Sequence, residues 1–226
     1  MTLLVLAAIV WIAVHSGIAG TSVRGALVRR FGEPRFRAAF SVTSIAALVF
    51  LIVAYRHAPV VPVWFAPRGL RDFLTLVMLV AFVLFAGAVT TRNPTSIGGE
   101  TAPPEPPRGM QRVTRHPMLW SFALWAAVHM IALGTADGFL FFGAILVAAI
   151  RGMPSIDAKL AARNPALWAE LARGTSILPF GAILAGRNRL VLAEIGWIGP
   201  LAAFVAWVAF LAFIHRFLFG VSPLAG

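Results

Sequence analysis

The chain has 226 residues, of which 60% are hydrophobic and only 12% are charged. Charged residues make up about 25% of an ordinary soluble domain, so this composition excludes a soluble globular protein and predicts an integral membrane protein in a lipid bilayer. The formal net charge of +11 does not indicate a nucleic-acid partner, because the basic residues fall between apolar segments, as they do when they orient helices in a membrane.

Apolar segments long enough to cross a membrane, or nearly so, recur six times along the chain. Each crossing takes about 20 residues, so we predict an all-α integral membrane protein with about six transmembrane helices in a single domain, residues 1–226. The first segment follows no basic region and precedes no small-residue cleavage site, so we expect a retained span and not a signal peptide. The predicted spans are residues 3–19, 38–55, 73–90, 117–134, 136–150 and 196–219.

The fourth and fifth spans are joined by only five residues, 134–138, which begin and end with glycine. Such a short connection predicts a tight antiparallel helical hairpin.

A cytoplasmic amphipathic segment is predicted between the fifth and sixth spans. Asn164 and Pro165 form an N-cap and a first-turn proline, and Gly174 can end the helix in the left-handed conformation. Leu167 and Leu171 share one face, so the segment should lie on the membrane surface or cap the bundle.

Basic residues are concentrated in alternate loops. The positive-inside rule therefore places three basic loops in the cytoplasm and both termini outside, which is the periplasm for a bacterial inner membrane. The cytoplasmic set is Arg24, Arg29, Arg30, Arg35, Arg37, Arg92, Arg108, Arg112, Arg115, Arg151, Lys159, Arg163, Arg173, Arg187 and Arg189, and the outer set is Arg56, Arg68, Arg71 and Arg216.

Four of the five histidines fall inside or at the ends of predicted spans. An imidazole in the hydrocarbon region costs free energy unless it is hydrogen-bonded or bound to metal, so each is a functional candidate. Histidines on facing helices are typical ligands of haem iron, whereas any one of them could instead bond a neighbouring helix. These residues are His15, His116, His129 and His215.

Two arginines, Arg112 and Arg115, precede His116 where the fourth span begins, and Pro117 occupies its first turn. A cationic helix start with free N–H groups suits an anionic group such as a haem propionate, a phosphate or a lipid headgroup. The alternative is that both arginines only fix the orientation of the span.

Two long motifs, MQRVTRHPMLWSFALWAAVHM at 110–130 and RGTSILPFGAILAGR at 173–187, resemble the NnrU family, whose relatives include the 15-cis-ζ-carotene isomerases. The resemblance extends to HSG at 15–17, AEIGWIGP at 193–200 and FLFGVSP at 217–223. It therefore covers nearly the whole chain.

The resemblance implies haem b as cofactor and a cis-trans isomerisation of a carotenoid or related polyene without net oxidation. It also implies that His15 and His129 are the two axial ligands of the iron. The isomerases have a cysteine three residues before the second histidine, where this chain has Ala126. A cysteine-based switch of ligation is therefore not expected.

Helix geometry leaves the second ligand open. At about 1.5 Å per residue, His15 lies about 7 Å from the cytoplasmic end of its span, and His129 lies roughly 19 Å from His116. The two can share an iron if the haem lies nearly parallel to the membrane. Otherwise His116 is the better partner for His15.

Two other functions remain as alternatives. A non-enzymatic haem protein that assists or regulates nitrogen-oxide metabolism is the first. The second follows from a weaker resemblance of the RHP and TSILPF segments to membrane methyltransferases that use S-adenosylmethionine. Those enzymes have an acidic pair where this chain has only Asp157.

Overall fold

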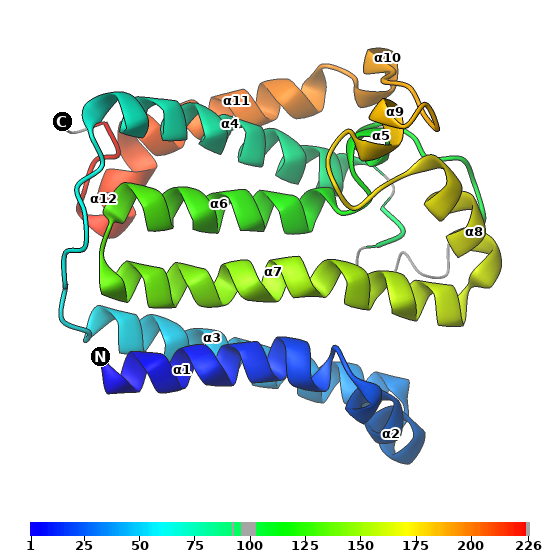
Figure 1. Ribbon diagram of the computed structural model, residues 1–226, viewed down its shortest axis with the longest axis horizontal. Helices are drawn as coiled ribbons and strands as arrows, with labels where there is room; N and C mark the ends of the chain where they lie inside the picture. Colours follow the sequence, from blue (N-terminus) through cyan, green and yellow to red (C-terminus); the bar gives the residue numbers. More distant parts are fainter. Residues whose placement is uncertain (92, 96–102, 225–226) are drawn as a thin grey trace. The chain divides into compact units, whose positions relative to one another are not determined.

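The computed structural model describes residues 1–91, 93–95 and 103–224 (Figure 1), so Arg92 of the predicted cytoplasmic set lies outside the described residues. All the long elements among these residues are helices, which confirms the all-α membrane class. The only β-type pairing described is an isolated bridge between Pro62 and Thr135.

Backbone contacts divide the chain into two compact units. The first unit is Met1–Pro67 with Ala126–Ser155, and the second is Arg68–Trp125 with Ile156–Gly226. Two helices, α6 (Pro117–Leu133) and α7 (Ala136–Arg163), contribute residues to both units. The assignment of the chain to one domain stays a prediction.

Within the described ranges, four helices are long and apolar enough to cross a membrane, or five if the bent pair Thr2–Ile18 and Ser22–Phe31 counts as one span. The sequence predicted about six. The difference is α6 (Pro117–Leu133), which is apolar but only 17 residues long. The four are α3 (Glu33–Arg56), α4 (Arg68–Thr90), α7 (Ala136–Arg163) and the segment Ile198–Phe219.

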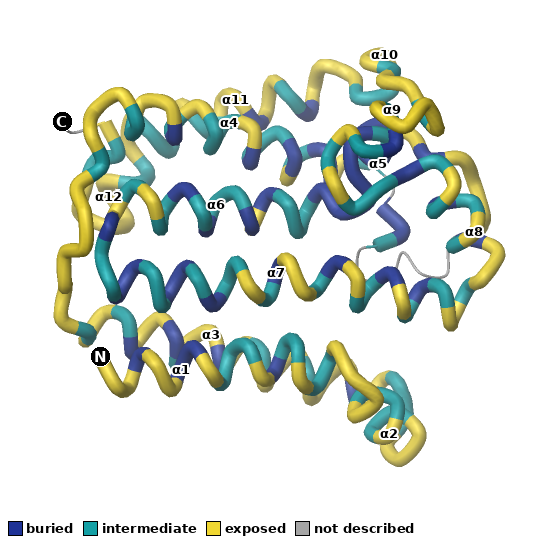
Figure 2. Tube along the Cα trace, in the orientation of Figure 1, coloured by how far each residue is buried: buried dark blue, intermediate teal, exposed yellow. Residues whose placement is uncertain are grey.

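The first unit begins with an apolar helix, α1 (Thr2–Ile12), which continues as a π-helix, η1 (Ala13–Ile18). The chain then bends by 72° into α2 (Ser22–Phe31), where the Thr21 hydroxyl accepts a hydrogen bond from the Val23 N–H. Because α3 returns along α1, the two are antiparallel neighbours. Their buried residues, dark blue in Figure 2, are Leu4, Ala7 and Ala8 of α1 and Phe36, Ala47, Leu51 and Ala54 of α3.

The hairpin between α6 and α7 is confirmed. Gly134 adopts a φ of +62° between the two helices, and its carbonyl accepts hydrogen bonds from the backbone N–H groups of Val63 and Trp64 at 2.8 and 3.0 Å. The Trp64 indole donates to the Ile131 carbonyl at 2.9 Å. The loop after α3 is therefore fastened to the hairpin.

The fifth predicted span, 136–150, was too short. Helix α7 continues to Arg163 and passes through Pro154. Hydropathy ends at Arg151 because charged residues follow, but good helix formers such as Ala and Leu continue the helix beyond the apolar region. The extension matters because it carries Asp157.

In the second unit, α4 packs along α11, and the Trp207 indole donates a hydrogen bond to the Thr75 carbonyl at 3.0 Å. The remaining helices of this unit are α5 (Met110–Val113), α8 (Pro165–Gly174), α9 (Gly181–Leu184), α10 (Leu192–Ile195), α11 (Ile198–Ala209), η3 (Phe210–Ile214) and α12 (His215–Phe219).

The predicted amphipathic segment forms α8. Asn164 caps it by accepting a hydrogen bond from the Leu167 N–H at 3.1 Å, as expected. The expected left-handed end at Gly174 was wrong, since the helix includes Gly174 and stops at an extended Thr175. Leu167 and Leu171 are buried together with Leu160 of α7, so this face of α8 covers the end of α7.

Candidate functional site

The imidazole of His15 lies in the π-helix that ends the first apolar segment. Its Nδ1 bonds the Trp11 carbonyl at 2.9 Å, and since a carbonyl only accepts, Nδ1 carries the proton and Nε2 keeps a lone pair. Metal-binding histidines are commonly oriented in this way by a backbone carbonyl, and π-helical turns are frequent at functional sites. If a haem is bound, His15 would hold its iron through Nε2.

The ring of His129 occupies a different level of the first unit. It stacks on Phe142 at 4.8 Å, and Phe142 contacts Tyr55 at 6.1 Å near the end of α3. His15 instead contacts Phe40 at 5.8 Å. Phe40 and Tyr55 are separated by about 22 Å along α3 at 1.5 Å per residue. These contacts do not bring His15 and His129 together, and their pairing on one iron stays a prediction.

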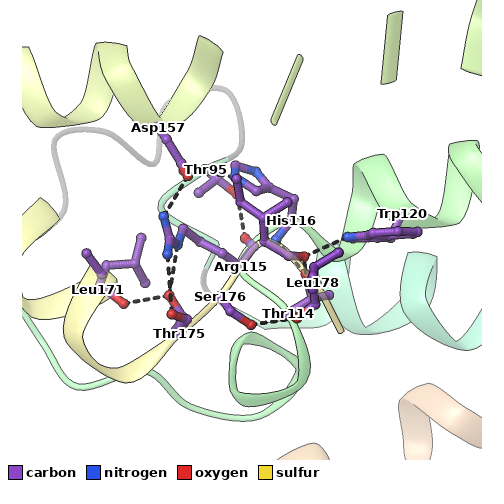
Figure 3. A network of polar contacts seen from close by, with 12 residues as sticks. Thr95, Thr114, Arg115, His116, Trp120, Asp157, Leu171, Thr175, Ser176 and Leu178 are labelled. Carbon is purple, nitrogen blue, oxygen red and sulfur yellow. Dashed lines mark hydrogen bonds and ion pairs between the residues drawn. The ribbon is translucent and has the colours of Figure 1, made fainter. Parts of the chain in front are cut away.

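His116 belongs to a buried polar network in the second unit (Figure 3). Its Nε2 bonds Asp157 Oδ1 at 2.8 Å, and Arg115 Nη1 donates to Asp157 Oδ2 at 2.6 Å. The exposed fractions of Arg115, His116 and Asp157 are only 7%, 1% and 7%. One carboxylate therefore serves two neighbouring nitrogen groups away from solvent.

The Arg115 guanidinium has further partners. Its Nε donates to the Thr175 hydroxyl at 2.9 Å and its Nη2 to the Thr175 carbonyl at 3.3 Å, and it lies 4.6 Å from the centre of the Trp168 ring. Burial is the largest influence on the pKa of Arg115 and lowers it, whereas Asp157 acts in the opposite direction. All of these hydrogen-bond partners are protein groups, so the N–H donors of the guanidinium point into the protein.

The other nitrogen of His116 has no hydrogen-bond partner among the residues that the structure describes. Nδ1 is buried without a hydrogen bond, and because Asp157 accepts the Nε2 proton, Nδ1 carries a lone pair in the neutral imidazole. In that state the network contains one nitrogen acceptor that no described residue uses.

The two motifs behind the family resemblance meet at this network. The Arg115 N–H donates to the Ser176 carbonyl at 2.8 Å, and the Thr114 hydroxyl and the Trp120 indole both donate to the Ile177 carbonyl, at 2.8 and 2.7 Å. The TSIL segment therefore fixes the approach to α6.

Arg112 is paired separately. Its guanidinium donates to both carboxylate oxygens of Glu194 at 2.7 and 2.8 Å and to the Asn188 side chain at 2.6 Å. The bonds from Arg112 to this carboxylate, with one from the Gly109 N–H, lower the pKa of Glu194 to about 2. Both predicted anion-binding arginines are thus engaged within the chain, and their binding of an external anion stays a prediction.

Sequence reasoning missed the carboxylate partners. Asp157 was noted only as a lone acidic residue, and Glu194 was not singled out, although both are rare acidic residues among many arginines. That scarcity was a usable signal, because an acidic residue in an arginine-rich chain finds a basic partner readily.

The described residues include no group of three or more histidine, cysteine or acidic side chains that could hold a bare metal ion. His215, the remaining candidate in a span, bonds the Val221 carbonyl through Nδ1 at 2.8 Å. A haem, which brings its own four nitrogens, needs only one or two protein ligands.

These features define an α-helical membrane protein with histidines in both of its compact units. The chain belongs to the NnrU protein family, whose profile matches residues 3–223. It is also 25% identical over 191 residues to the chloroplastic 15-cis-zeta-carotene isomerase of Zea mays, an alignment that covers 83% of this chain and 52% of that protein. The chain therefore spans about half the length of this relative. No solved structure matches it significantly.

Proposed function

We propose that this chain is a haem-b-dependent membrane isomerase that converts cis double bonds of a carotenoid-like polyene to trans. The reaction class rests on the family and on the isomerase named above. The observation that supports the cofactor is the orientation of His15: its Nδ1 bonds the Trp11 carbonyl, which leaves Nε2 with a lone pair for iron.

The residues of the chain have distinct parts in this function. The Trp11 carbonyl orients the His15 imidazole, and the Trp11 ring, centred 3.9 Å from that of His15, restricts its rotation. Apolar helices supply a water-poor environment in which a hydrocarbon polyene is soluble. When bound, haem iron would supply one-electron chemistry that lowers the barrier to rotation about a double bond without net oxidation.

The expected partners are the bilayer and the polyene, in a bacterial inner membrane with both termini periplasmic. His129, implied by the family resemblance, and His116, with its unused Nδ1, are the two candidates for the second ligand.

The test uses detergent-purified protein. Oxidised and dithionite-reduced absorption spectra report the haem through its Soret band, and incubation with 15-cis-ζ-carotene followed by chromatography reports isomerisation. Haem together with loss of the 15-cis isomer supports the proposal. Haem without isomerisation supports an accessory or regulatory haem protein instead, and absence of haem refutes both.

A further inference from the structure

Three of the four buried side-chain atoms that lack a hydrogen-bond partner in the described residues lie around His15. They are Trp11 Nε1, Ser16 Oγ and Ser44 Oγ. Inside a membrane, the hydroxyls of in-helix serines commonly bond a neighbouring helix, but these two have no such partner among the described residues. A buried donor left unpaired loses its hydration without compensation, and inside a membrane no bulk water restores it.

Two of these donors belong to facing helices at one level. His15 contacts Phe40 across the interface between α1 and α3. Because the helices are antiparallel (Figure 1), one turn back from His15 on α1 is level with one turn forward from Phe40 on α3. Those positions are Trp11 and Ser44, so an indole N–H and a hydroxyl lie at the same depth.

We propose that the α1–α3 interface beside His15 binds a ligand that carries an oxygen acceptor into the membrane, with Trp11 Nε1–H and Ser44 Oγ–H as its donors. The class of ligand rests on the proposed function. A pure hydrocarbon offers no acceptor, so these donors strengthen the binding of a polyene with a keto or hydroxyl group relative to its hydrocarbon analogue, without excluding the hydrocarbon.

A haem carboxylate has the same acceptor chemistry. Trp11 lies one turn, about 6 Å, deeper than His15 from the basic end of the span. A neutral carbonyl or hydroxyl is less costly at that depth than a charged carboxylate. The oxygen of a polyene end group is therefore the favoured acceptor.

The experiment compares two matched probes, β-carotene and its 4-keto derivative echinenone, bound to the full chain in lipid nanodiscs. Wild-type protein should bind echinenone more tightly and lower its carbonyl stretching frequency in the vibrational spectrum. Trp11→Phe retains the ring beside His15 and the backbone carbonyl but removes the N–H, and Ser44→Ala removes the hydroxyl. Each should weaken echinenone binding roughly three- to tenfold, the value of one hydrogen bond, and leave β-carotene binding unchanged.

The control is Ser41→Ala, since Ser41 is an exposed serine on the same helix and its replacement should alter neither probe. Loss of haem from Trp11→Phe and Ser44→Ala, without any echinenone preference, would support the site with a haem carboxylate as the acceptor. Equal binding of both probes and unchanged haem in both variants would overturn it. The proposed function would survive that result if the protein still contained haem and isomerised 15-cis-ζ-carotene. Conversely, an echinenone preference in protein that does not isomerise 15-cis-ζ-carotene would support this binding site and contradict the proposed function.

Discussion

His116 donates a hydrogen bond from Nε2 to Asp157 Oδ1 across 2.8 Å, while its Nδ1 is buried and meets no partner within residues 1–91, 93–95 and 103–224. The other oxygen of the same carboxylate accepts from Arg115. Asp157 is thus the shared acceptor of the network, and its loss would leave a buried guanidinium without its counter-charge.

Asp157→Ala should destabilise the protein by about 3–5 kcal/mol, the cost of removing one partner from a buried ion pair. Thermal or denaturant unfolding in detergent measures this. The control is Glu170→Ala, which breaks an ion pair in which the Arg173 side chain is 73% exposed and should cost less than about 1 kcal/mol. Equal effects of the two substitutions would contradict the buried role of Asp157.

Removing an axial ligand should change the haem spectrum. His15→Ala is expected to abolish haem binding or convert a six-coordinate, low-spin spectrum to a five-coordinate, high-spin one, because an iron–nitrogen bond is lost. His57→Ala should leave the spectrum unchanged, since His57 is exposed and follows α3.

The second ligand is decided by comparing His129→Ala with His116→Ala. Loss of the low-spin spectrum in His129→Ala alone supports the ligand implied by the family. The same loss in His116→Ala alone supports the imidazole with the unused nitrogen. If the purified protein never contains haem, the methyltransferase alternative is favoured, and calorimetry would then measure S-adenosylmethionine binding.

The Arg112–Glu194 pair should make stability depend on pH. The pKa of Glu194 falls from 4.5 to about 2 in the folded protein, so ionised Glu194 contributes stability above pH 4.5 that is lost as the pH falls toward 2. Glu194→Gln should therefore lower the melting temperature at pH 7 and have little effect near pH 2. A melting-temperature difference that does not shrink between pH 5 and pH 2 would contradict this coupling.

Gly134→Ala should destabilise the hairpin between α6 and α7. A Cβ at Gly134 would lie 2.3 Å from the Trp64 carbonyl oxygen, in addition to the strain of a φ of +62°. Gly186→Ala is the matched control, because Gly186 has a φ of +68° but nothing within 4 Å. Conformational strain alone costs about 1–2 kcal/mol, and Gly134→Ala should exceed Gly186→Ala in denaturant unfolding.

Topology is testable with a reporter that functions only in the cytoplasm. A fusion after Gly174 should give signal and a fusion after Gly226 should give none, because the basic loops are expected to remain inside. The opposite pattern would reverse the orientation.

Hydropathy located most of the spans, and the short connection with Gly134 located the hairpin. Both depend on local features: apolar segments of sufficient length, and a glycine where the turn requires one. It ended the fifth span too early, since the apolar pattern stops at Arg151 while the helix continues to Arg163. In α7, the apolar segment that can cross the membrane is therefore shorter than the helix that contains it.

The candidate sites were predictable only in part. An intramembrane His15 stood out because imidazoles are rare in apolar segments, and its bond to Trp11 is local. The pairing of His116 with Asp157 spans 41 residues and depends on tertiary packing, which periodicity does not encode. The unpaired hydroxyl of Ser44 was likewise invisible, because sequence alone does not show whether a neighbouring helix offers a partner.

The π-helix at Ala13–Ile18 is equivalent to one extra residue inserted into an α-helix. Deleting a single residue there, such as Ala13, would let the segment return to α-helical hydrogen bonding without a gap. Because the shorter chain and the tighter α-helical winding nearly cancel, the helix on either side of the deletion would keep its facing. Trp11 would stay level with Ser44, but His15 would follow Trp11 by three residues instead of four and would lose its bond to the Trp11 carbonyl. The orientation of this imidazole therefore depends on one residue of helix length.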